Sequence, residues 1–165
     1  MLFDHIKTHP SDKTALDTKS DQVSYGELSR RIEAYAHRLG SVDVLGIALD
    51  NGIEWVLWDL AALKAGVVCI PLPPFFTKDQ IDHSIASAGI THLVTPDDIV
   101  PTGFQRSQLI PDGTAKITFT SGTTGTPKGV CLPTSAMMNV AGSIKDLLGD
   151  DFAGKHASVL PLAVL

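Results

Sequence analysis

A glycine- and threonine-rich stretch carries the residue types that bind phosphate. Residues 117–132 read ITFTSGTTGTPKGVCL and contain a single lysine, Lys128. Glycines let backbone N–H groups turn toward an anion without obstruction by a Cβ, and threonine and serine hydroxyls add further donors. Pro127 has no N–H, so residues 120–126 must supply the backbone donors. We predict that this stretch is a phosphate loop with Lys128 as its compensating charge.

Apolar residues flank this loop with the spacing of strands. Ile117 and Phe119 alternate before it, and Val130 and Leu132 alternate after it, which predicts strand, tight loop and strand. A mobile Gly/Ser/Thr linker is the alternative, but a linker needs neither flanking strands nor a fixed lysine. A Walker loop requires Ser or Thr after the lysine, whereas glycine follows Lys128, and no Gly-x-Gly-x-x-Gly fingerprint occurs.

These residues resemble the phosphate-loop signature of the adenylate-forming superfamily, which includes acyl- and aryl-CoA synthetases, nonribosomal peptide adenylation domains and beetle luciferases. That signature is an apolar residue, two variable positions, a Ser/Thr/Gly-rich run and Pro-Lys-Gly. Ile117, residues 120–125 and residues 127–129 match it here. The resemblance implies that the loop binds the β- and γ-phosphates of ATP through Thr120, Ser121, Gly122, Thr123, Thr124, Gly125 and Lys128.

The resemblance also implies a two-step reaction. A carboxylate attacks the α-phosphorus of ATP to give an acyl-adenylate and pyrophosphate, and a thiol, usually coenzyme A, then takes the acyl group. Lys128 is the implied catalytic residue, because it balances the charge that builds on the departing pyrophosphate. Thr120 is the implied residue that approaches Mg²⁺. ATP, Mg²⁺ and coenzyme A are therefore the expected cofactors, with a carboxylic acid as the substrate.

Two alternatives stay open. The full-length protein could be a fatty-acyl-AMP or aryl-acid ligase that passes the acyl group to a carrier protein instead of coenzyme A. It could also be a non-catalytic module that uses the same sheet and loop for nucleotide binding or for interaction with another protein.

The rest of the sequence predicts the elements that must hold this loop. Capping signals occur at Ser24/Glu27, at Asn51/Glu54 and at Thr77/Gln80, each before a stretch with helical periodicity. Helices and strands are expected to alternate, with helices over 24–40, 51–65 and 77–89 and strands over 42–49, 67–72 and 90–94. This order predicts an α/β fold in which a mostly parallel sheet is flanked by helices.

The family resemblance extends across about residues 20–165. The first subdomain of these enzymes commonly contains a Tyr-x-Glu-Leu helix, a helix ending Lys-Ala-Gly and a strand leading into Pro-Leu. The corresponding segments here are Tyr25–Leu28, Leu63–Gly66 and Ile70–Pro73. The approach to the first strand, Gly40–Leu45, departs from the family because it is shorter than in many relatives.

Four segments are predicted, all within one incomplete N-terminal domain. Residues 1–22 are a lead-in with a short helix near Phe3–Thr8 and otherwise little pattern, and residues 23–94 form the α/β unit. Residues 95–114, rich in Pro, Asp, Gly and Gln, are a linker and the segment expected to be least ordered. Residues 115–165 contain the phosphate loop, a helix with Met138 and Ile144 on its core face, and a truncated strand.

The length and the C-terminal sequence indicate a fragment. The chain has 165 residues, whereas such enzymes need roughly 500, and the apolar run Ala157–Leu165 ends without a cap or a turn. We therefore expect the chain alone to be inactive. We also expect copies to associate through exposed sheet edge and apolar helix surface.

Charge and composition limit the partners. The net charge of −5 is not gathered into runs, so neither nucleic acid nor an anionic membrane is an expected partner. No apolar run approaches the about 20 residues of a membrane span, and a cytoplasmic location is expected. Cys69 and Cys131 are expected to be packed free thiols, and the histidines lack metal-ligand spacing.

Overall fold

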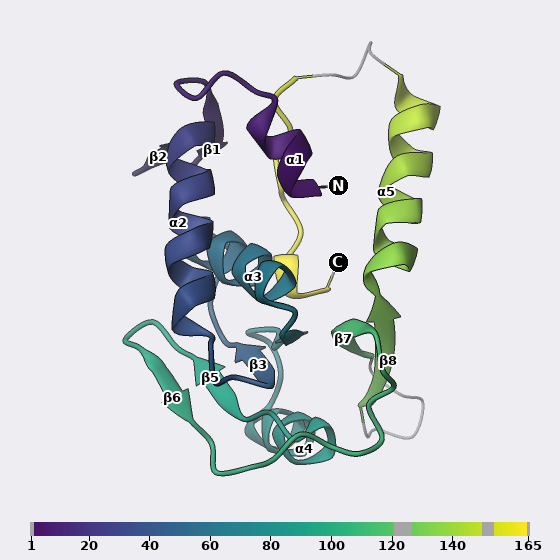
Figure 1. Ribbon diagram of the computed structural model, residues 1–165. Coiled ribbons are helices and arrows are strands. Elements are labelled where there is room, and N and C mark those ends of the chain that lie inside the picture. Colours follow the sequence, from purple (N-terminus) through teal and green to yellow (C-terminus); the bar gives the residue numbers. More distant parts are fainter. Residues whose placement is uncertain (1, 121–126, 150–153, 165) are drawn as a thin grey trace.

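A six-stranded sheet forms the centre of the computed structural model, which describes residues 2–120, 127–149 and 154–164. The strand order is β6-β5-β3-β4-β7-β8. The four inner strands are parallel, and the two outer strands pair antiparallel with their neighbours, which confirms the mostly parallel sheet (Figure 1). The strands are β3 Val44–Ile47, β4 Val68–Pro71, β5 His92–Val94, β6 Ile99–Pro101, β7 Thr114–Thr120 and β8 Lys128–Pro133.

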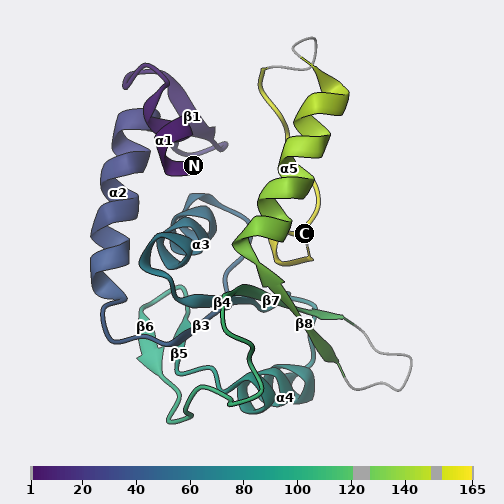
Figure 2. The same ribbon diagram turned by 45° about the vertical axis from the view of Figure 1, so that its right-hand side comes forward.

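Helices cover both faces of this sheet (Figure 2). On one face, α3 (Ile53–Ala65) packs Trp55 and Trp58 onto the sheet, and α2 (Tyr25–Arg38) lies outside α3. On the other face lies α4 (Lys78–Ala88). Strand residues alternate between these two cores, as the pleat requires, so the inner strands are buried on both sides. Both tryptophans are core residues, each 4% exposed.

The predicted helix caps at Ser24 and Thr77 are confirmed. Ser24 Oγ accepts a hydrogen bond from the backbone N–H of Glu27 at 3.2 Å. Thr77 and Gln80 form a full capping box at the start of α4, in which each side chain accepts from the backbone N–H of the other residue. Both α2 and α4 therefore begin at the residues that the capping signals indicated.

The predicted cap at Asn51 is wrong. Helix α3 begins after Gly52 and has no side-chain cap. The Asn51 amide instead binds the C-terminal segment, where Nδ2 donates to the Leu160 carbonyl at 2.9 Å and Oδ1 accepts from the Leu162 N–H at 2.8 Å. A segment more than 100 residues away thus competes successfully for the capping side chain.

The N-terminal lead-in contains more structure than its sequence indicated. The short helix is present as α1 (Leu2–Lys7). Residues predicted to have little pattern form an antiparallel hairpin of β1 (Thr14–Asp17) and β2 (Gln22–Ser24). These strands are only four and three residues long, too short to show a clear alternation in the sequence.

Residues 95–114, which their composition predicted to be a linker, include one short strand. This is β6, whose Ile99 and Val100 pair with β5. Ile110 from the same segment is buried in the core beneath the sheet. The left-handed Gly89 at the end of α4 also lies against this segment, since a Cβ there would stand 1.9 Å from the Gln105 carbonyl oxygen. Tertiary pairing therefore orders a stretch that has little periodicity of its own.

The C-terminal part differs from expectation in two ways. Helix α5 (Thr134–Leu148) is present, but it contains no buried residue, so Met138 and Ile144 do not form a core face. The expected truncated strand is instead an irregular segment that ends in a short 3-10 helix, η2 (Leu162–Val164). Pro161 cannot donate to a strand ladder, and Ala163 is buried beside α3 and β4 rather than paired in the sheet.

Candidate functional site

The predicted phosphate loop lies at the end of the β7–β8 hairpin. The two strands pair antiparallel from Thr114 to Thr120 and from Pro133 back to Lys128, so Thr120 stands opposite Lys128. This confirms the two predicted strands. Five of the predicted phosphate-binding residues lie outside the described residues, namely Ser121, Gly122, Thr123, Thr124 and Gly125. Thr120 and Lys128 mark the two ends of the loop and are both exposed.

A hydrogen bond connects these two ends. Thr120 Oγ1 donates to the carbonyl oxygen of Lys128 at 3.4 Å, which is a long contact. Within residues 2–120, 127–149 and 154–164, no carboxylate forms an ion pair with Lys128. Its ammonium group is therefore not neutralised by that part of the chain and is available to an anion at the mouth of the hairpin.

The downstream end of the loop packs closely against side chains of β7. A Cβ at Gly129 would stand 2.9 Å from Ile117 Cγ2 and 3.3 Å from Phe119 Cζ, so a larger residue would displace these side chains. The glycine of the Pro-Lys-Gly run thus leaves room for Ile117 and Phe119 beside Lys128.

A histidine from α4 also contacts this end of the loop. His83 Nε2 lies 3.1 Å from the carbonyl oxygen of Pro127, and the His83 ring stands edge-on to Phe119 at a centroid distance of 6.5 Å. Pro127 is buried. The sequence analysis considered histidines only as metal ligands and missed this contact, because His83 and Pro127 are 44 residues apart and no motif joins them.

An open cleft of about 180 Å³ lies between α4 and the hairpin. Most of its wall is apolar, with polar groups at its edge from His83, Ser87 and Ser107. The remaining lining residues are Ala88, Leu109, Ile110, Ile117, Phe119, Pro127, Gly129 and Cys131. The cleft ends at Pro127 and Gly129, the residues on either side of Lys128.

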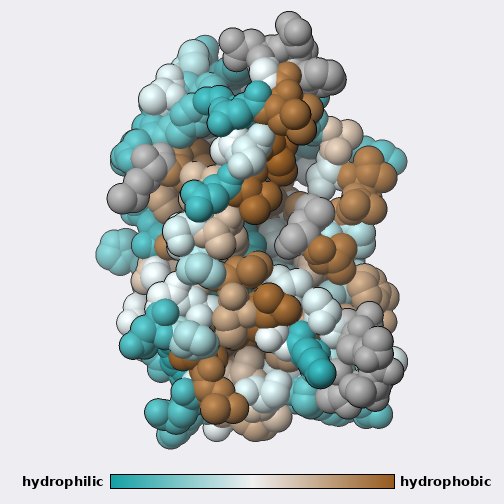
Figure 3. Space-filling view, turned by 90° about the vertical axis from the view of Figure 1, so that its right-hand side faces the viewer, coloured by the Kyte–Doolittle hydropathy of each residue, from teal (hydrophilic) through white to brown (hydrophobic). Residues whose placement is uncertain are grey.

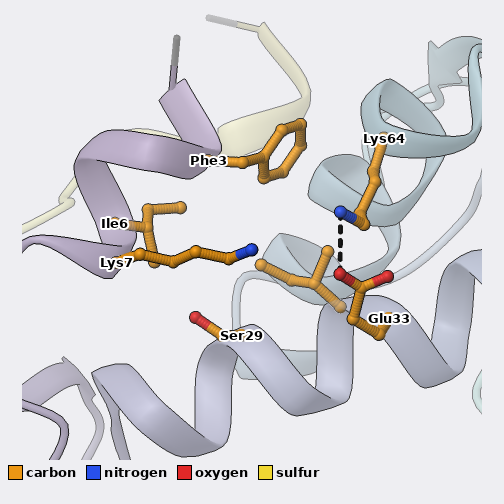
Figure 4. A pocket seen from close by; sticks show the side chains of 7 residues that line it. Phe3, Ile6, Lys7, Ser29, Glu33 and Lys64 are labelled. Carbon is orange, nitrogen blue, oxygen red and sulfur yellow. Dashed lines mark ion pairs between the residues drawn. The ribbon is translucent and has the colours of Figure 1, made fainter.

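A second hollow, between α1, α2 and α3, is too small for a ligand. Its volume of about 10 Å³ is that of a single water site. Figure 4 shows Lys64 beside Glu33 at its edge, with an Nζ–Oε1 distance of 2.8 Å. Phe3 and Ile6 from α1 lie opposite. The hollow is a packing gap beside an ion pair.

The other face of β7 carries a partly buried ion pair that the sequence analysis also missed. Lys116 Nζ lies 2.7 Å from Asp59 Oδ1, and both side chains are at most one-fifth exposed. Cys69 Sγ donates to the same carboxylate at 3.3 Å. Burial, reinforced by the charge of Asp59, raises the pKa of the Cys69 thiol well above its usual value. An aspartate within the apolar helix α3 was the signal that such a partner exists.

Two buried polar atoms on these elements, Trp55 Nε1 and Thr118 Oγ1, have no hydrogen bond among the described residues. The ion pair connects α3 to the strand that leads into the loop and so holds β7 against α3. Asp59 already neutralises Lys116, so Lys116 offers no free charge to a phosphate.

The described ranges contain no group of three or more His, Cys, Asp or Glu residues that could hold a metal ion. Among the same residues, no helix is both long enough and apolar enough to span a bilayer. The described residue with the predicted approach to Mg²⁺ is Thr120, whose exposed hydroxyl is the hard oxygen donor that this ion prefers.

The sequence matches the family of AMP-binding enzymes over residues 2–110 and 104–164. Phosphinothricin tripeptide synthetase PhsC of Streptomyces viridochromogenes is 31% identical over 163 residues, which cover 81% of this chain and 15% of that protein. Bacitracin synthase 1 of Bacillus licheniformis is 29% identical over 175 residues, which cover 91% of this chain and 3% of that protein. The chain thus spans a small part of the length of these relatives.

Solved structures share the fold. The N-terminal subdomain of NpsA from Klebsiella oxytoca, in complex with 3-hydroxybenzoyl-AMSN, superposes with a TM-score of 0.64 at 29% identity over 80% of this chain and 40% of that chain. The o-succinylbenzoate CoA synthetase MenE of Bacillus subtilis superposes with a TM-score of 0.78 at 21% identity over 98% of this chain and 49% of that chain. The second likeness concerns the fold alone.

Proposed function

This chain belongs to the family of AMP-binding enzymes, and from that premise we propose that the protein containing it activates a carboxylic acid with ATP. The observation that carries the proposal is the β7–β8 hairpin, whose mouth presents Thr120 and Lys128 opposite each other. The glycine- and hydroxyl-rich residues 121–126 connect these two positions. A loop of this composition between two fixed strand ends suits a polyphosphate.

The proposed chemistry is adenylation. A carboxylate oxygen of the substrate attacks the α-phosphorus of ATP, the bond to the bridging oxygen breaks, and pyrophosphate leaves with its electron pair. Lys128 neutralises the charge that develops on pyrophosphate, and Thr120 contributes a hydroxyl at the other end of the loop. Mg²⁺, when bound, would share this neutralisation of the phosphates. One preorganised donor of this kind is typically worth about 3 kcal/mol in the transition state.

The acceptor of the acyl group is proposed to be a thiol. The relatives named above are peptide synthetases, which supports the thiol of a carrier protein. Coenzyme A, which the family resemblance implies, is the second candidate. The choice of acceptor changes the second step of the reaction and leaves adenylation the same. The same phosphate loop therefore serves either reaction.

Calorimetry tests the nucleotide part of this proposal on the 165-residue chain. We expect MgATP and pyrophosphate to bind, and Lys128→Ala to weaken both by at least about tenfold, because a charge-assisted contact between the ammonium group and phosphate is worth about 1.4 kcal/mol or more. Lys145→Ala, which removes an exposed lysine from α5, is the matched control and should bind as the parent does. Equal affinity of the parent and Lys128→Ala would refute the assignment of Lys128.

A further inference from the structure

His83 joins α4 to the last loop residue before Lys128. Its Nε2 lies 3.1 Å from the carbonyl oxygen of Pro127, across 44 residues of sequence. We propose that His83 is a positioning residue, which fixes the downstream end of the phosphate loop and thereby the backbone from which Lys128 reaches the phosphates. This inference rests on the proposed function and extends it to a residue outside the loop.

The acceptor in this contact determines which atom of His83 carries a hydrogen. A carbonyl oxygen can only accept, so His83 Nε2 must carry a hydrogen and donate it to Pro127. The contact therefore requires a hydrogen on Nε2 and links α4 to the end of the loop.

Packing around the contact leaves the end of the loop little freedom. Pro127 is buried and has a restricted φ, and the His83 ring stands edge-on to Phe119. Two residues further on, Gly129 fits tightly against Ile117 and Phe119. Lys128 lies between these two fixed positions, so its backbone is held on both sides while its side chain is exposed.

The hydrogen bond lowers the cost of ordering this site when phosphate binds. Without the bond, the Pro127 carbonyl loses its partner from α4, and the segment before Lys128 must be ordered by the ligand itself. A hydrogen bond of this kind contributes enough to change an affinity by about 3- to 10-fold. We expect that range for its loss.

Two substitutions separate the hydrogen bond from the shape of the ring. His83→Gln keeps an amide N–H at about the reach of Nε2, whereas His83→Phe keeps a ring against Phe119 but has no donor. We expect His83→Phe to weaken MgATP binding by about 3- to 10-fold and His83→Gln to stay within about twofold of the parent. Ser87→Ala, at the edge of the same cleft, is the control and should have no effect. Equal losses in the Gln and Phe variants, or no loss in either, would overturn the proposal.

A second readout needs no nucleotide. Nitrogen NMR of the imidazole should show a hydrogen on Nε2 of His83, and amide exchange of Lys128 and Gly129 should be faster in His83→Phe than in the parent. Amides in α3 serve as the internal control for global unfolding. Unchanged exchange at Lys128 and Gly129 would overturn the positioning role. A parent chain that binds no MgATP would contradict the proposed function, yet this exchange test would still decide whether His83 fixes the loop.

Discussion

Helices α3 and α5 have similar lengths and both carry many apolar residues, but their surroundings are opposite. Helix α3 has 13 residues, of which six are buried, whereas α5 has 15 residues, none of them buried. Leu57 of α3 is fully buried in a cluster with Leu28 and Ile32 of α2, whereas Leu147 of α5 is 85% exposed. Figure 3 shows apolar side chains gathered on the face of the molecule that includes α5.

Polar contacts follow the same division. Helix α3 is joined to α2 by the ion pairs of Glu54 with Arg31 and of Lys64 with Glu33, and to β7 by that of Asp59 with Lys116. No described residue forms an ion pair with α5. Apolar residues allow a helix to pack in a core, but the helix is buried only where neighbouring elements cover it. The β7–β8 hairpin, whose strands end at Thr120 and begin again at Lys128, precedes α5 in the chain.

The largest expected difference is in stability. Leu57→Ala should lower the free energy of unfolding by about 3 kcal/mol, because it removes buried methyl groups and leaves a cavity. Leu147→Ala should change it by less than about 0.5 kcal/mol, because the side chain is already in solvent. Urea unfolding followed by the fluorescence of Trp55 and Trp58 measures both.

The same experiment contains its own control. Alanine has the highest helix propensity, so Leu147→Ala does not disturb α5 itself. A loss above about 2 kcal/mol at Leu147 would show that α5 is packed in solution and would remove the contrast between the helices.

The two cysteines provide a second test of the contrast. Cys69 lies under α3 and is 2% exposed, whereas Cys131 lies in β8 and is only partly buried at the cleft. An alkylating reagent should therefore modify Cys131 in the native protein and Cys69 only on unfolding. Mass spectrometry after timed labelling measures this. Equal labelling of both thiols would mean that the core beneath α3 opens easily.

Cys69 also predicts a pH dependence. Burial raises the pKa of this thiol in the folded chain, so the unfolded chain releases its thiol proton first as the pH rises. Stability is therefore retained below the usual thiol pKa of about 8.5 and falls above it, by at most about 1.4 kcal/mol per pH unit for one proton. In Cys69→Ala this part of the decline should disappear. An unchanged slope between pH 8 and pH 10 would contradict the assignment to Cys69.

Local sequence predicted the parts of the fold that depend on local interactions. The cap at Thr77, the end of α4 at Gly89 and the pairing around the phosphate loop each follow from residues close together in the chain. The family resemblance, carried by the loop motif, added the expected role of Lys128. These predictions needed no knowledge of distant contacts.

The predictions that failed depend on distant contacts. Asn51 does not cap α3 because Leu160 and Leu162 bind its side chain. The segment that contains β6 is ordered by pairing with β5, although its composition is that of a linker. His83 could not be identified as a neighbour of the loop, since only the position of α4 on the sheet brings it to Pro127.

The smallest expected effect concerns association between copies of the chain. Exposed apolar residues on α5 include Val140, Ile144 and Leu147, and a patch of this kind favours association. The outer strand β8, in which Val130 is 46% exposed, offers a sheet edge as the other route. Concentration-dependent sedimentation of the 165-residue chain should therefore show self-association.

Two lysine substitutions decide which surface is used. Leu147→Lys places a positive charge near the C-terminal end of α5, where the helix dipole tolerates it, and Val130→Lys places one on the sheet edge. If α5 is the contact, Leu147→Lys should weaken association by about fivefold, because burying one apolar side chain is worth about 1 kcal/mol or more, and Val130→Lys should not. The reverse order would assign the contact to β8. A chain that stays monomeric over the whole concentration range would contradict the predicted self-association. It would show that the exposed apolar face of α5 is tolerated in water.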